Sequence, residues 1–83
     1  MQLSGAQIRA ARALLRWSAE ELAKRAKLGR VTITRAEAMD GETALTEANA
    51  DAVRRALEGG GVLFIEANGE GPGVRLRRAP DAV

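Results

Sequence analysis

The sequence of 83 residues predicts a small, mainly α-helical domain with four helices and a C-terminal β-hairpin. Apolar residues recur at helical spacing in four segments between residues 4 and 60, and capping or turn residues separate these segments. After the glycines at 59–61, a short apolar run and a strictly alternating segment replace the helical pattern. A chain of this length forms one domain with a small core.

The first two helices are predicted from their caps. The first helix begins at Ser4, whose side chain suits the N-cap position. Its apolar stripe comprises Ile8, Ala11 and Leu15, with Leu14 widening it. Ser18 is the expected N-cap of the second helix, because Glu21 follows at the spacing of a capping box, in which each side chain accepts from the other residue's backbone N–H. The second helix is expected to bury Leu22, Ala23 and Ala26.

Two further helices follow. Gly29 is expected as the N-cap of a third helix that runs from Arg30 to about Met39 and stops at the turn signal of residues 40–41. Its inward residues are Ile33 and Ala36. The fourth helix opens at Thr46 and Glu47, pairs Val53 with Leu57 on its buried face and ends in the glycine run.

Residues 62–77 are predicted to form the hairpin, with turn-forming residues at 68–73 between its strands. The first strand is apolar on both faces, so both faces need cover. Val62 and Phe64 are expected to pack on the helices, which leaves Leu63 and Ile65 for another partner.

We expect that partner to be the same hairpin of a second copy, joined as one continuous sheet or as a face-to-face sandwich. The expected interface of this homodimer comprises Val62, Leu63, Phe64, Ile65, Val74 and Leu76. The alternative is a monomer in which the loop and tail fold back over the hairpin.

Charge divides the chain into two unlike halves. Residues 1–35 carry eight basic and two acidic side chains, whereas residues 36–83 carry five basic and nine acidic ones. A basic half beside an acidic half is the charge distribution expected of a polyanion-binding region joined to a region with another role. Solvated helix faces are the alternative explanation.

The composition also excludes several kinds of site. The chain has no cysteine and no histidine, so it lacks disulfides, thiolate metal sites and the commonest general base. No nucleophile–base pair or phosphate-binding glycine loop is visible, and we therefore expect neither an enzyme nor a cofactor or metal. No apolar run reaches the length of a membrane span and no signal peptide is visible, which makes the cytoplasm the expected location.

The order of several residues resembles a known family. The run ARALLRWSAEELA at residues 11–23 is followed by Ile33, Arg35 and Glu37, and GPGVRL stands at residues 71–76. Over about residues 6–78 this order resembles the XRE (Cro/CI-like) helix-turn-helix family, particularly its short bacterial members. The resemblance implies a lambda-repressor-like fold. We divide the chain into a helix-turn-helix domain at 1–60, a dimerising hairpin at 61–78 and a frayed tail at 79–83.

The resemblance also implies roles for individual residues. In this family the second helix of the pair enters the major groove. The implied base contacts are Arg30, Val31, Thr32, Thr34 and Arg35. Phosphate contacts are expected from Ser18, Arg16, Lys24, Arg25 and Lys27. An ion pair between Arg12 and Glu37 is implied to orient the recognition helix, and Trp17 is expected in the core. Lys27 stands where the family commonly has glycine, so it is expected to adopt a conformation that glycine prefers.

These observations predict a sequence-specific DNA-binding transcriptional regulator, a repressor or autoregulator, that binds an inverted repeat as a dimer in the nucleoid. The expected partners are double-stranded DNA and a second copy, without a membrane. The alternative is a protein-interaction module, an antitoxin or adaptor, whose hairpin and acidic half bind a partner protein.

Overall fold

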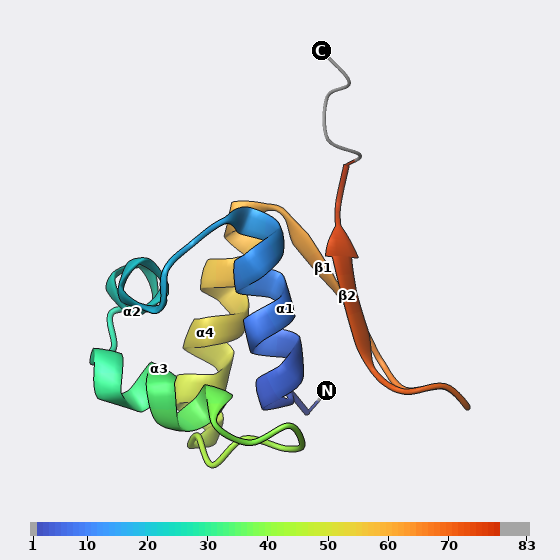
Figure 1. Ribbon diagram of the computed structural model, residues 1–83, viewed down its shortest axis with the longest axis horizontal. Helices are drawn as coiled ribbons and strands as arrows, with labels where there is room; N and C mark the ends of the chain where they lie inside the picture. Colours follow the sequence, from blue (N-terminus) through green and yellow to red (C-terminus); the bar gives the residue numbers. More distant parts are fainter. Residues whose placement is uncertain (1, 79–83) are drawn as a thin grey trace.

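The computed structural model describes residues 2–78, so the tail expected to fray at 79–83 lies outside the described residues. The described part has four helices and one antiparallel hairpin, as the sequence predicts. The helices are α1 (Gly5–Leu15), α2 (Ala19–Ala26), α3 (Arg30–Glu37) and α4 (Glu47–Gly60), and the strands are β1 (Val62–Ile65) and β2 (Gly73–Leu76). In Figure 1, α1 and α4 occupy the centre, with α2 and α3 on one side of them and the hairpin on the other.

The predicted caps are present, but the capping boxes differ from the prediction. At α1, the Ser4 hydroxyl accepts from the Gln7 N–H and the Gln7 side chain accepts from the Ser4 N–H, each at 3.0 Å, which completes a box that the sequence analysis missed. At α2, Ser18 accepts from the Glu21 N–H at 3.0 Å. The Glu21 carboxylate instead binds Arg25 at 2.6 Å, because the i,i+4 ion pair takes the group that would complete the box.

The structure differs from two predictions, one about the buried face of the first helix and one about the end of the third helix. Leu14 was expected to widen the apolar stripe of α1, but its side chain is 40% exposed, because it lies about 100° around the helix from Leu15. The third helix ends at Glu37 rather than near Met39, and the Met39 side chain is 50% exposed. The buried stripe of α1 is therefore narrower than predicted, whereas the predicted inward residues of α3, Ile33 and Ala36, are both buried.

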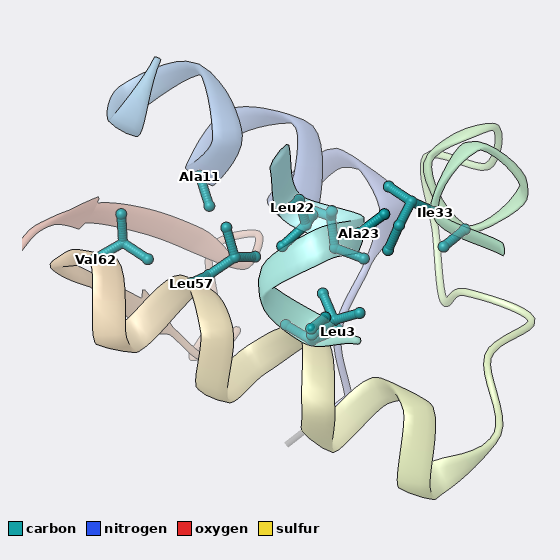
Figure 2. Packing of buried hydrophobic residues seen from close by; sticks show 11 residues of the cluster. Leu3, Ala11, Leu22, Ala23, Ile33, Leu57 and Val62 are labelled. Carbon is teal, nitrogen blue, oxygen red and sulfur yellow. The ribbon is translucent and has the colours of Figure 1, made fainter. Parts of the chain in front are cut away.

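The core lies where the four helices and β1 meet. Figure 2 shows Ala11, Leu22, Ile33, Leu57 and Val62 converging from five different elements. The fully buried large side chains are Ile8, Leu22, Ile33, Leu57, Val53 and Val62. Small buried residues lie between them and let the helices approach closely: Ala11, Ala23, Ala26 and Ala36.

The hairpin register decides which strand residues face the core. Val62 pairs with Leu76 and Phe64 pairs with Val74, so these four side chains share one face. That face packs on the helices: Val62 is fully buried, and the other three are partly buried against the core. All four residues were expected in a dimer interface, but Val62 has no exposed surface within one copy and the other three lie on the inward face. The dimer itself stays a prediction. The outward face carries Leu63 and Ile65.

Gln7 ties the hairpin to α1. Its side chain is 2% exposed, and its Nε2 donates to the Gly73 carbonyl at 3.0 Å and to the Ile65 carbonyl at 3.4 Å. The same amide caps α1 through Ser4, so one buried side chain satisfies the helix start and the loop end of the hairpin together. No local pattern in the sequence indicates this contact, because it joins residues more than fifty positions apart.

Gly5 marks the closest approach between α1 and the end of α3. A methyl group at this position would lie 1.7 Å from the Met39 carbonyl oxygen and 2.6 Å from the Ala36 carbonyl oxygen. Both atoms belong to the backbone, so the clash cannot be relieved by a side-chain rotation. The Gly5 N–H also donates to the Gly41 carbonyl at 2.9 Å, which fixes the same approach.

We predict that Gly5→Ala lowers the free energy of unfolding by about 3 kcal/mol, because the backbones have to separate. Gly59→Ala is the matched control: a methyl group there meets nothing within 4 Å, and the helical position should gain about 0.5–1 kcal/mol. Urea unfolding followed by circular dichroism measures both changes. Equal effects of the two substitutions would show that the approach at Gly5 is not tight.

Candidate nucleic-acid interface

Two eight-residue helices, α2 and α3, meet through a turn of three residues. Lys27 ends α2 with φ 59° and ψ 43°, and its N–H together with that of Leu28 bonds the last carbonyls of α2. The expected left-handed conformation of Lys27 is thus confirmed, and it costs about 1–2 kcal/mol relative to glycine. Gly29 caps α3 without a side-chain hydrogen bond, so the first turn of α3 is open to solvent.

The outward face of α3 carries polar, basic and apolar side chains. Ile33, Ala36 and Glu37 are buried and define the inward face. At about 100° per residue, Val31 and Arg35 lie opposite Ile33, and both are exposed, Val31 by 63%. Of the remaining residues expected to contact bases, Arg30 and Thr34 are exposed and Thr32 is partly buried.

Two arginines of α1 hold the C-terminal end of α3. Arg12 donates from Nε and Nη2 to the two carboxylate oxygens of Glu37, each at 2.8 Å. The Glu37 side chain is only 9% exposed, so the pair is partly desolvated. The hydrogen bonds with Glu37 raise the pKa of the Arg12 guanidinium, although burial acts in the opposite direction. Arg9 donates to the Glu37 carbonyl and pairs with Asp40, and both cations suit the negative end of a helix.

Two contacts hold the Arg25 side chain in place, one with Trp17 in the link before α2 and one with Glu21 in α2. Its guanidinium lies 4.3 Å from the centre of the Trp17 ring, and its Nε donates to Glu21 at 2.6 Å. Trp17 is partly buried against the core and fits over Gly60, where a methyl group would lie 2.6 Å from the ring. This arrangement gives Arg25 a structural role, which the charge pattern alone did not reveal.

The other basic residues that were expected to contact phosphates lie in two separate regions. Lys24 follows Glu20 by four residues, so both project from the same side of α2, whereas Lys27 is exposed at the C-cap of α2. Glu20 reaches Arg30 at 3.9 Å, which shows that this side of α2 faces the start of α3. Arg16 lies apart from them, exposed at the C-cap of α1 with φ 59°.

The surface formed by Lys24, Lys27, Arg30, Val31, Thr34 and Arg35 is called the α2–α3 surface below. Its arginines can donate two parallel hydrogen bonds to one acceptor edge, its threonine can donate or accept, and its valine can cover a methyl group. Its lysines can neutralise phosphates without geometric preference. These are the groups needed to bind a polyanion that also presents base edges.

No protein-family model matches the chain, and no curated protein is similar enough to it to count as a relative. Within residues 2–78, no helix is both long and apolar enough to cross a membrane. The same part of the chain has no group of three or more carboxylates arranged to hold a metal ion.

We predict that Arg12→Ala lowers the free energy of unfolding by about 3–5 kcal/mol, because the Glu37 carboxylate stays buried without its partner. Arg55→Ala is the matched control, since Arg55 forms a 2.9 Å ion pair with Asp51 on the exposed side of α4 and should change stability by less than about 1 kcal/mol. Denaturant unfolding of both variants makes the comparison. Similar losses would mean that the Arg12–Glu37 pair does not hold α3.

Proposed function

We propose that this protein is a sequence-specific DNA-binding transcriptional regulator of the XRE (Cro/CI-like) helix-turn-helix type, with α3 as its recognition helix. The main support for the proposal is the difference between the two ends of α3. Its C-terminal end is fixed to α1 through the Arg12–Glu37 pair, whereas its first turn and outward face are exposed. A helix held at one end in this way can enter the major groove without losing its own support.

The side chains of α3 supply the direct contacts with bases in this proposal. Arg30 and Arg35 donate to the O6 and N7 atoms of guanine, and Val31 covers a thymine methyl group. Thr34 adds a hydroxyl at the exposed face, and Thr32 contributes from its flank. Each bidentate arginine contact discriminates against a wrong base by about 1–3 kcal/mol.

Phosphate contacts set the orientation on the duplex. Lys24 lies on the side of α2 that faces the start of α3, and Lys27 is exposed in the turn before α3, so these two are the main phosphate contacts. Ser18 accepts from the Glu21 N–H, which leaves its hydroxyl hydrogen free to donate to a phosphate oxygen. Arg16 is a secondary contact. Counterion release at these positions makes binding strongly dependent on salt.

The regulator acts as a dimer through the outward face of the hairpin. Leu63 and Ile65 lie on that face, and the Ile65 side chain is 37% exposed. The hairpin and α3 lie on opposite sides of α1 and α4, so a second copy on the hairpin leaves α3 uncovered (Figure 1). Two recognition helices then bind half-sites about 34 Å apart in an inverted repeat, and an operator overlapping a promoter gives repression by occlusion.

We predict that Arg30→Ala with Arg35→Ala weakens binding to the preferred DNA sequence at least about tenfold, because each bidentate contact contributes about 1–3 kcal/mol. Selection from random duplex DNA at near-physiological salt first defines that sequence, and fluorescence anisotropy then measures affinity. Arg54→Ala with Arg55→Ala, on α4, is the control with the same loss of charge. Unchanged affinity in the α3 variant would contradict the proposed base contacts.

We predict that Leu63→Asp with Ile65→Asp converts the dimer into a monomer, because two charges would be buried at the interface. Analytical ultracentrifugation at tens of micromolar should find twice the 8.8 kDa chain mass for the native protein and 8.8 kDa for the variant. Leu14→Asp with Met39→Asp replaces two exposed apolar side chains elsewhere and should leave the dimer intact. A native protein that sediments as a monomer would contradict this dimer and leave the hairpin face free for a partner protein.

A further inference from the structure

Glu20 lies in the first turn of α2, where the helix dipole favours an acidic residue, and it also lies beside the basic residues of the α2–α3 surface. Its Oε2 lies 3.9 Å from Nη1 of Arg30, across the gap between the first turns of α2 and α3. Its side chain is 79% exposed and projects from the same side of α2 as Lys24. A carboxylate among these cations repels phosphates, so it lowers affinity for DNA in general. Its contact with Arg30 is therefore the feature that could offset this repulsion.

Arg30 needs support that its own helix does not provide. It is the first residue of α3, and the preceding Gly29 has no side chain to bond it or to cap the helix. In the described part of the chain, Glu20 is the carboxylate that pairs with Arg30. A guanidinium carries five N–H donors in a planar fork, so contact through one terminal nitrogen leaves other donors free to bind a base edge.

We propose that Glu20 is a positioning residue that keeps Arg30 directed at a base edge and away from phosphates, a role that rests on the proposed function. In the specific complex the Glu20–Arg30 pair persists, and exclusion of water strengthens it. In a non-specific complex the charge of Glu20 repels a phosphate that approaches Arg30, whereas a neutral base edge meets no such repulsion. Glu20 therefore raises the ratio of specific to non-specific affinity.

The test is Glu20→Gln, with affinities measured for the selected operator and for a scrambled duplex across a salt series. Operator affinity should fall about twofold to fivefold, the upper part of the range that exposed ion pairs cover. Scrambled-duplex affinity should rise at least about threefold, and its dependence on salt should steepen by about 0.9 for each phosphate that Arg30 gains. Glu47→Gln is the matched control, because Glu47 is an exposed glutamate in the first turn of α4 and its loss changes the net charge equally.

A double-mutant cycle separates positioning from general charge. In an Arg30→Ala background, Glu20→Gln should no longer change the ratio of the two affinities. If Glu20→Gln raises both affinities equally, Glu20 only repels phosphate and the inference is overturned. If the native protein prefers no DNA sequence, the proposed function itself fails. If the native protein prefers a sequence and Glu20→Gln leaves that preference unchanged, only the role of Glu20 fails.

Discussion

The buried ion pair between Arg12 and Glu37 is the interaction on which the arrangement of the helices depends. One guanidinium binds both oxygens of the Glu37 carboxylate on α3 and the Trp17 carbonyl in the link from α1 to α2. Because the carboxylate is 9% exposed, its charge needs this partner. An eight-residue helix such as α3 would not be stable alone, so its orientation comes from such contacts and from the burial of Ile33.

The support of α3 is concentrated at its C-terminal end, where Arg9 and Arg12 complement the helix dipole. The opposite end begins after Gly29 and presents its side chains to solvent. The turn before it contains Lys27 in a left-handed conformation that glycine would adopt without strain. The domain therefore keeps a strained lysine at a position where glycine would fit without strain. This lysine places a positive charge beside the open end of α3, at a cost that matters in a domain of limited total stability.

Much of the fold could be predicted because it depends on neighbouring residues in the sequence. The caps at Ser4 and Ser18 were found in this way, since each needs only a local pattern. The second half of the box at Ser18 and the outward position of Leu14 were mispredicted, because side-chain competition and small angular differences decide them. Contacts between distant segments left no local signal. The hydrogen bonds from Gln7 to the hairpin belong to this class. The stacking of Arg25 on Trp17 joins residues closer in sequence, but it depends on side-chain directions that the charge pattern does not show. The role of Arg25 as a phosphate contact stays a prediction.

The hydrogen bonds of Gln7 make the hairpin part of the same rigid unit as α1. Its amide bonds both strands beside the connecting loop and also caps the helix, so the loop end of the hairpin cannot move away from α1 without breaking these hydrogen bonds. In a dimer joined through the hairpin, the separation of the two recognition helices is then fixed by the protein. Inserting one base pair between half-sites shifts them by about 3.4 Å and rotates them by about 35°. A rigid dimer of the proposed kind could not follow that change, so it would discriminate against operators of altered spacing as well as altered sequence.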